Sequence, residues 1–262
     1  MITLKIIHCA DVHLASALEA SLSATQARQR RDELLARFGA LVRYAQENDV
    51  RALIIAGDLF DAGVVPARTR DYVFDLMRSA PEIEFFYVRG NHDAAVPPQD
   101  VPNLTVPPRD GQWLLRRVGA VTIALCDPKK DDAAYPARLK LDAQSVNIVV
   151  LHGNIGAPKT MGQELALKDF AGKNIDYLAL GHLHAYRTGQ LDTRGTWCYS
   201  GCLEGRGFDE CGVKGFVELN VDVQRIAARF VPFALRTMHA RSADLRDCRT
   251  MQQVEQAVLA AV

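Results

Sequence analysis

The chain has 262 residues, 48% of them hydrophobic and 24% charged, and its 31 Lys and Arg residues balance 31 Asp and Glu residues. This composition fits one large globular domain with a short appendage, and the neutral total excludes an overall positive field that would attract nucleic acid. No apolar run approaches the roughly 20 residues that span a bilayer. The first residues also lack the apolar stretch of a signal peptide, so we expect a cytoplasmic protein with no membrane partner.

Short apolar runs alternate with helical stretches along most of the chain. Residues 23–48 place apolar side chains at helical spacing behind Ser23, which can cap the first turn. A second helix is expected over residues 66–79, because proline is favourable in a first turn. Strands are expected at residues 4–8, 52–56, 85–88, 121–125, 146–151 and 177–180. This alternation of strands and helices predicts an α/β fold.

The later part of the chain has a different pattern. The proline-rich residues 97–108 predict a surface excursion between two strands. Residues 215–221 and 225–232 are strand-like and joined by a turn, so we expect them to form a hairpin in a second sheet. Residues 240–262 predict one strand and one amphipathic helix, as if the chain entered a further small domain.

Five short polar motifs each begin where a predicted strand ends. They are Asp11-Val-His13, Gly57-Asp58, Gly90-Asn91-His92-Asp93, His152-Gly153 and Gly181-His182-Leu-His184. Loops at the carboxyl ends of strands are where α/β folds place their ligand sites. Any one of these motifs alone is more often a hydrogen-bonded turn or core residue than a ligand. The presence of all five, with five of the seven histidines, predicts one shared site.

The residue types in the motifs indicate metal chemistry. Side chains two residues apart, as in Asp11-x-His13, point to the same side of an extended backbone. Imidazole nitrogens, carboxylates and an amide oxygen suit Mn²⁺, Fe²⁺ or Zn²⁺ better than Ca²⁺. Neighbouring glycines allow a close approach that a Cβ would block. The six cysteines lie outside the motifs and fit no common zinc spacing, so we expect reduced thiols.

The order D-x-H, GD, GNHD, HG and GHxH resembles the calcineurin-like metallophosphoesterase family. Within it, HCADVHL, GDLFD, RGNHD, LHG and LGHLH resemble the DNA-repair nuclease branch, which contains the SbcD-like nuclease subunit of the bacterial SbcCD complex. Residues 199–210 and 212–222 are similar to the segment that YhaO-like exonucleases carry after their last histidine motif. The resemblance covers residues 4–233.

This resemblance implies two divalent metal ions, with Mn²⁺ preferred and Fe²⁺ or Zn²⁺ as alternatives. It implies that Asp11, His13 and His184 bind the first ion, that Asn91, His152 and His182 bind the second, and that Asp58 bridges the two. His92 matches the catalytic histidine of the family, and Asp93 either orients a histidine or caps the following turn. The chain departs from the pattern at Asp61, where some repair nucleases have a second histidine, and at Cys202, where relatives have a small polar residue.

The resemblance also implies the fold and the substrate. The fold is a four-layer α/β/β/α sandwich over residues 1–235, and residues 236–262 begin a small, incomplete capping domain. The implied activity is two-metal-dependent hydrolysis of DNA, as a single strand or at duplex ends, by an exonuclease or endonuclease. Related nucleases dock an SMC-like ATPase subunit. Arg89 and Arg206 are the candidate substrate contacts.

Two alternatives use the same motifs. The first is a phosphodiesterase or phosphatase acting on small nucleotides or phosphoproteins, and the second is a scaffold that keeps the fold without catalysis, against which the intact ligand set counts. Further loop cations could touch phosphate, although such side chains are more often solvated surface charges; they are Arg68, Arg70, Lys129, Lys130 and Lys159. Four arginines of the first helix (Arg28, Arg30, Arg31 and Arg37) are expected on its exposed face.

Overall fold

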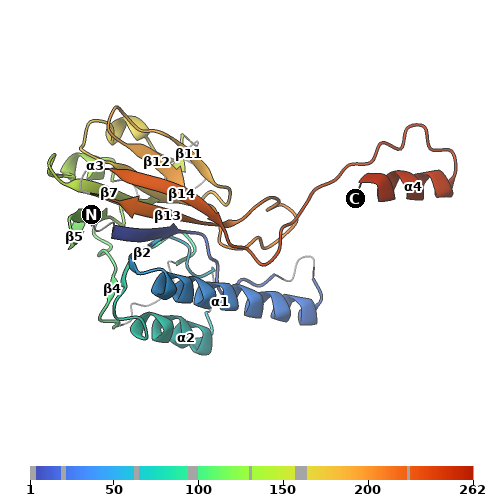
Figure 1. Ribbon diagram of the computed structural model, residues 1–262, viewed down its shortest axis with the longest axis horizontal. Helices are drawn as coiled ribbons and strands as arrows, with labels where there is room; N and C mark the ends of the chain where they lie inside the picture. Colours follow the sequence, from blue (N-terminus) through green and yellow to red (C-terminus); the bar gives the residue numbers. More distant parts are fainter. Residues whose placement is uncertain are drawn as a thin grey trace.

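Two six-stranded sheets stack face to face to form the body of the molecule (Figure 1). The computed structural model describes residues 4–18, 22–61, 65–93, 100–129, 132–156, 164–222 and 225–261, so Lys130 and Lys159 lie outside the described residues. The first sheet has the spatial order β14 (Ile226–Pro232), β13 (Gly215–Val221), β1 (Leu4–Cys9), β2 (Val50–Ala56), β3 (Glu84–Val88) and β4 (Leu104–Thr105). The second has the order β11 (Arg187–Gln190), β12 (Thr196–Tyr199), β10 (Tyr177–Gly181), β7 (Val146–His152), β6 (Val121–Leu125) and β5 (Leu114–Val118).

Helices cover the outer face of each sheet. Two long helices, α1 (Ala24–Glu47) and α2 (Ala67–Arg78), lie along the first sheet, as Figure 1 shows. The outer face of the second sheet is covered by α3 (Tyr135–Arg138), a 3₁₀ turn (Leu167–Asp169) and connecting loops. The remaining elements are the short pair β8 (Asn154–Ile155) and β9 (Glu164–Leu165), and the helix α4 (Met251–Ala261).

The first helix begins where the sequence predicts it. The Ser23 side chain accepts a hydrogen bond from the Gln26 backbone N–H, and the Gln26 side chain accepts one from the Ser23 backbone N–H. This reciprocal capping box satisfies two amide groups that have no partner within the helix. The second predicted helix is also confirmed, with Pro66 as its N-cap residue and Ser79 as its C-cap.

The central strands are buried on both faces, and alternate residues enter different cores. In the first sheet, Ile7 and Ile55 pack under α1 and α2, whereas Ile6 and Ile54 pack between the two sheets. This period of two is the geometry of an extended strand, and burial on both faces is typical of parallel strands covered by helices. The core residues therefore confirm the predicted four layers, of which the fourth is thin.

The direction of the strands decides where the candidate site lies. In the first sheet, β1, β2 and β3 are parallel, and in the second, β7 and β10 are parallel. Because parallel strands end at the same edge of a sheet, the loops that follow these five strands can meet. All five polar motifs lie in these loops.

Two expectations for the later part of the chain are wrong. The hairpin of β13 and β14 forms, but it extends the first sheet, because β13 pairs antiparallel with β1 from Leu4↔Val221 to His8↔Val217. Such a pairing between distant segments leaves no local signal in the sequence. No strand occurs at residues 240–250, although α4 follows as predicted. Among the described helices, none has the length and apolar character needed to cross a membrane.

Candidate metal centre

The loops after β1 and β2 are held against each other by backbone hydrogen bonds. The Asp11 N–H donates to the Gly57 carbonyl at 3.0 Å, and the His13 N–H donates to the Asp58 carbonyl at 2.9 Å. The Leu14 N–H continues this ladder one residue further on. These bonds fix three candidate ligands on adjoining loops, independently of any ion.

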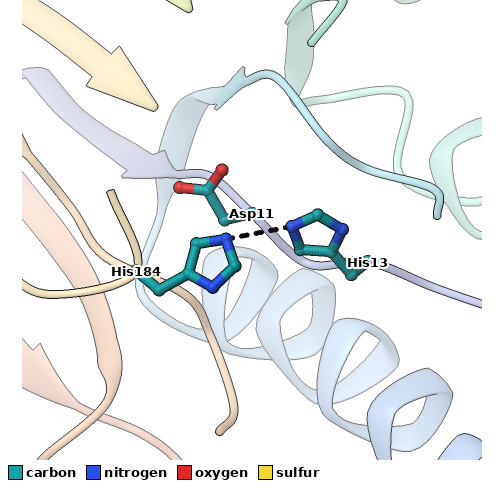
Figure 2. A group of neighbouring side chains, drawn as sticks. All are labelled: Asp11, His13 and His184. Atoms are coloured by element: carbon teal, nitrogen blue, oxygen red, sulfur yellow. Dashed lines mark hydrogen bonds between the residues drawn. The ribbon is translucent and has the colours of Figure 1, made fainter. Parts of the chain in front are cut away.

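The three residues expected at the first metal come together from distant parts of the chain. Asp11, His13 and His184 each offer a ligand atom, and these atoms all lie within 4.8 Å of one another. Figure 2 shows a ring nitrogen of each imidazole pointing toward the other. The distance between His13 Nε2 and His184 Nε2 is 3.1 Å. Ligand atoms roughly 2.1 Å from a common ion lie about 3.0 to 3.5 Å apart, so this spacing suits coordination.

The residues expected at the second metal also converge. Asn91 Oδ1 lies 3.1 Å from His152 Nε2 and 3.3 Å from His182 Nδ1. The two imidazole rings stand nearly perpendicular, with 5.3 Å between their centroids. All three residues lie at or just after the ends of strands, because β3 precedes Asn91, His152 is the last residue of β7, and β10 precedes His182.

Asp58 lies between the two groups. Its Oδ2 is 3.7 Å from His13 Nε2 and 3.4 Å from His152 Nε2, so one carboxylate oxygen faces a ligand of each group. The side chain is buried, and its other oxygen, Oδ1, accepts a hydrogen bond from the His92 backbone N–H at 2.9 Å. This position fits a carboxylate that is shared by two cations.

The backbone at the ligands differs from the expected extended conformation. Asp11 and His13 have φ of 51° and 48°, and His182 has φ of 106°. The two side chains of Asp11-x-His13 and the two of His182-x-His184 still reach the site. They do so because Asp11, His13 and His182 have positive φ, and not because side chains alternate along an extended strand. Asp and His enter the left-handed region more readily than most residues other than glycine.

The tautomers of two histidines suit a cation. His184 Nδ1 lies 2.6 Å from a Glu210 carboxylate oxygen, and His152 Nδ1 lies 2.9 Å from the Ala56 carbonyl oxygen. Because both partners are acceptors, each Nδ1 carries the proton and each Nε2 presents a lone pair to the site. Burial lowers the pKa of His152 to about 4, so this ring is neutral at pH 7. Its lone pair faces Asn91 and Asp58 oxygens, an arrangement of acceptors that a cation would satisfy.

The carboxylates suit a cation as well. Asp11 and Asp58 are 1% and 2% exposed, and burial together with the charge of Asp58 raises the pKa of Asp11 well above its ordinary value. Buried like charges are costly unless they are paired or bind a metal. Gly90 makes room for this arrangement, since a Cβ there would lie 2.1 Å from Asp58 Oδ1. The residues present therefore fit two divalent cations.

His92 lies beside the ligands and is held by Asp61. His92 Nδ1 is 2.6 Å from Asp61 Oδ1, and its ring centroid is 4.8 Å from that of His13. Asp61, where the sequence departs from the family pattern, thus provides a carboxylate partner for His92.

Asp93 has a different place: its buried carboxylate accepts hydrogen bonds from the backbone N–H groups of Leu59, Phe60 and Gly90. These bonds hold the turn that precedes Asp93, whereas the turn that it was expected to cap, at residues 94–99, lies outside the described residues.

The two candidate substrate contacts are placed differently. Arg89 donates to Asp127 at 2.7 Å and to the Pro107 carbonyl at 2.9 Å, so its charge is already paired. Burial raises the pKa of Asp127 to about 6 even though Arg89 donates to it. Arg206 lies next to the metal site, with NH1 3.5 Å from Asp61 Oδ2 and NH2 3.0 Å from Glu210 Oε1.

Glu210 is the site residue that the sequence did not reveal. Burial pushes its pKa upward, but hydrogen bonds from His184 and charge from Arg206 outweigh burial and hold the pKa at about 2. It therefore stays ionised and fixes the tautomer of His184. A lone glutamate in a glycine-rich turn, 26 residues after the histidine that it holds, has no spacing that would have indicated this contact.

Comparison with known proteins points in the same direction. A model of the calcineurin-like phosphoesterase family matches residues 4–186. The DNA double-strand break repair protein Mre11 of Aeropyrum pernix is 25% identical over 261 aligned residues, which cover 87% of this chain and 61% of that protein. The chain thus spans about three fifths of the length of this curated relative.

Solved structures share the fold. A dimetal phosphatase from Danio rerio superposes with a TM-score of 0.54 at 10% identity, covering 87% of this chain and 99% of that one. The protein TT1561 of Thermus thermophilus superposes with a TM-score of 0.52 at 12% identity, with the same coverage. At these identities the likeness shows the architecture alone.

Proposed function

Because the chain belongs to the calcineurin-like phosphoesterase family, we propose that it is a two-metal phosphodiester hydrolase that cleaves DNA, as an exonuclease or endonuclease of the DNA-repair type. The observation that carries the proposal is the position of Asp58, whose Oδ2 faces His13 in one ligand group and His152 in the other. A carboxylate shared in this way suits a pair of ions rather than one.

The proposed ligands divide as the family resemblance implies. Asp11, His13 and His184 would hold the first ion, Asn91, His152 and His182 the second, and Asp58 both. The mixture of nitrogen and oxygen donors suits Mn²⁺ best, with Fe²⁺ or Zn²⁺ as alternatives. When bound, two such ions lower the pKa of a water molecule to near neutrality and neutralise charge on the phosphate oxygens.

His92 is proposed as the proton donor to the leaving oxygen. As hydroxide forms a bond to phosphorus and the P–O bond to the leaving oxygen breaks, the leaving oxygen keeps the electron pair of the broken bond and takes the Nε2 proton of His92. Asp61, 2.6 Å from His92 Nδ1, orients the ring. Asp93 supports the reaction indirectly, because it holds the turn from which His92 projects.

The choice of DNA as the substrate rests on similarity and on the site together. The relative that shares 25% identity over most of this chain is a DNA double-strand break repair protein, and the motifs carry the same resemblance. Since the chain spans only part of that relative, an SMC-like ATPase partner and a capping domain that begins at Arg236 are further proposals. Arg206, beside His184 and Asp61, is the better placed of the two candidate substrate contacts.

A comparison of three substrates with added Mn²⁺ tests the proposal. Single-stranded DNA, bis-p-nitrophenyl phosphate and p-nitrophenyl phosphate would be incubated with the wild type and with Asp58→Asn, which is expected to lose both the shared ligand and turnover. The proposal predicts cleavage of DNA and of the diester by the wild type. Cleavage of the monoester alone would show a phosphatase, and no turnover with Mn²⁺ demonstrably bound would show a scaffold.

A further inference from the structure

A cavity of about 870 Å³ opens beside the first ligand group. Arg206 and Glu210 form part of its wall, and the same two residues contact the metal site, Glu210 through His184 and Arg206 through Asp61. The opposite wall comes from residues 236–239, just after β14, where the chain leaves the body toward α4 (Figure 1). Its volume lies within the roughly 300–1,000 Å³ of sites that bind small molecules.

The cavity wall carries an aromatic side chain in an unusual setting. Phe208 is 76% exposed, although large aromatic side chains are normally buried. It stands on a turn that closes with a hydrogen bond from the Glu210 N–H to the Gly207 carbonyl at 3.0 Å, and the Glu210 carboxylate accepts from the Arg206 N–H at 2.8 Å. The ring is therefore presented by a turn that the metal-site residue Glu210 anchors. Leu18, Leu22 and Met238 add apolar surface to the same cavity.

The arginines around the cavity are already paired. Arg30 is buried, contrary to the expectation of an exposed face, and donates to Glu204 and to the Gly205 carbonyl. Arg236 pairs with Glu33, and Arg206 pairs with Glu210. A cavity whose arginines are neutralised in this way has no excess positive charge for a phosphate. Its apolar walls fit a weakly polar group, such as an aromatic ring, instead.

We propose that this cavity receives an unpaired nucleobase next to the scissile phosphate, with the base stacked on Phe208. The proposal rests on the proposed function, since the phosphate itself would lie at the metal centre beyond Glu210 and Arg206. A base can enter only when it has left its pair, so the site selects single strands or frayed duplex ends. Base–aromatic stacking tolerates all four bases, and its loss on alanine substitution typically weakens binding about 5- to 150-fold per base.

Kinetics on small diesters test the inference. The p-nitrophenyl esters of thymidine 5′-phosphate and thymidine 3′-phosphate carry a base, whereas methyl p-nitrophenyl phosphate has the same leaving group and no base. For Phe208→Ala we expect the ratio of kcat/KM between a nucleoside ester and the methyl ester to fall about 5- to 100-fold, and for Phe208→Tyr to stay near wild type. Tyr72→Ala, which removes a partly exposed aromatic ring from α2, is the matched control and should leave the ratio unchanged.

A binding measurement makes the inference testable without turnover. A single-stranded oligonucleotide that contains 2-aminopurine loses fluorescence when that base stacks on an aromatic ring, and Ca²⁺ can replace Mn²⁺ to prevent cleavage. Wild type and Tyr72→Ala should quench the fluorescence, and Phe208→Ala should not. Equal quenching and equal kinetic ratios for Phe208→Ala and wild type would overturn the inference, whereas quenching with no hydrolysis of any diester would overturn only the proposed function.

Discussion

Three residues at the metal centre, Asp11, His13 and Asp58, adopt left-handed backbone with φ near 50°. Such conformations cost of the order of 1–3 kcal/mol each and persist only where the surrounding structure imposes them. Here the hydrogen bonds between the loops after β1 and β2 impose them. The candidate ligands are therefore positioned by the backbone independently of an ion, which is the preorganisation that the proposed metal site needs.

The role proposed for His92 predicts that its loss lowers turnover and leaves metal binding unchanged. His92→Ala is expected to lower kcat by about 10² to 10⁴, because the leaving oxygen loses its proton donor. Metal content, measured by elemental analysis, should stay near wild type, since His92 is not one of the seven proposed ligands. Asp61→Asn serves as the companion variant and should give a smaller drop with the same metal content. A loss of metal in proportion to the loss of activity would show that His92 is a ligand instead.

Gly90 is the position where one added carbon atom should disturb both ions. In Gly90→Ala the new Cβ would lie 2.1 Å from Asp58 Oδ1 and 2.6 Å from the Asp58 backbone nitrogen, so the shared carboxylate must move. We expect Mn²⁺ affinity, measured by titration calorimetry, to fall about 10- to 100-fold. Gly172→Ala, at a turn residue with φ of 73° and no atom within 4 Å of the added carbon, is the control for backbone strain without a steric contact. Unchanged affinity in Gly90→Ala would mean that Asp58 is not shared.

At the scale of elements, the strands that the sequence predicts well are those buried on both faces. The runs at β2, β7 and β10 are largely apolar and buried, and a motif begins at the end of each of them. Because parallel strands end at one edge, the seven proposed ligands could be assigned to one site from the sequence and its resemblance. Their positive φ values could not be predicted, since they depend on contacts between loops that are distant in the sequence.

Elements with weaker apolar patterns were missed. The strand β11 is mostly exposed and contains Gly189, so it shows no alternation of apolar and polar residues. The strand β4 has two residues inside the proline-rich segment. The predicted sheet for β13 is wrong, because β13 pairs with β1 and this pairing joins the two ends of the body in sequence. Long-range pairing and lone contacts such as that of Glu210 are decided by the fold as a whole.

One buried histidine makes the packing of β1 against β10 sensitive to pH. His8 Nδ1 lies 3.0 Å from the Tyr177 hydroxyl, and burial lowers the pKa of His8 to about 3. The unfolded chain takes up this proton near pH 6.5 and the folded chain only near pH 3, so stability falls as the pH falls through this window.

Urea unfolding at pH 7 and pH 5, with EDTA present, measures this effect. The wild type should lose about 2 kcal/mol more than His8→Gln between the two pH values, because the variant has no imidazole to protonate. Comparing the two proteins cancels the titration of the other histidines. Equal losses in both proteins would mean that His8 takes up its proton in the folded state.

At the scale of the whole molecule, the two sheets form the body and the helix α4 stands apart from it (Figure 1). The helix α4 has no buried residue among those described, and Met251 and Leu259 are largely exposed. This arrangement is consistent with the proposal that residues 236–262 begin a separate domain, whose helix contributes little to the stability of the body.

Truncation after Ala240 tests this division while keeping the cavity wall at residues 236–239. The melting temperature, measured by differential scanning fluorimetry, should change by no more than about 2 °C, because none of the described side chains after Ala240 is buried. Hydrolysis of bis-p-nitrophenyl phosphate should persist, since every proposed ligand remains. A large fall in melting temperature would mean that α4 packs against the body in solution and that the boundary near residue 236 is wrong.

The central claim is that seven side chains from five loops hold two cations that share Asp58. Anomalous scattering from crystals grown with Mn²⁺ tests it most directly. The account predicts two peaks about 3.5 to 4 Å apart, one against Asp11, His13 and His184 and the other against Asn91, His152 and His182, with Asp58 in contact with both. A single peak, or peaks that leave Asp58 unbound, would contradict it.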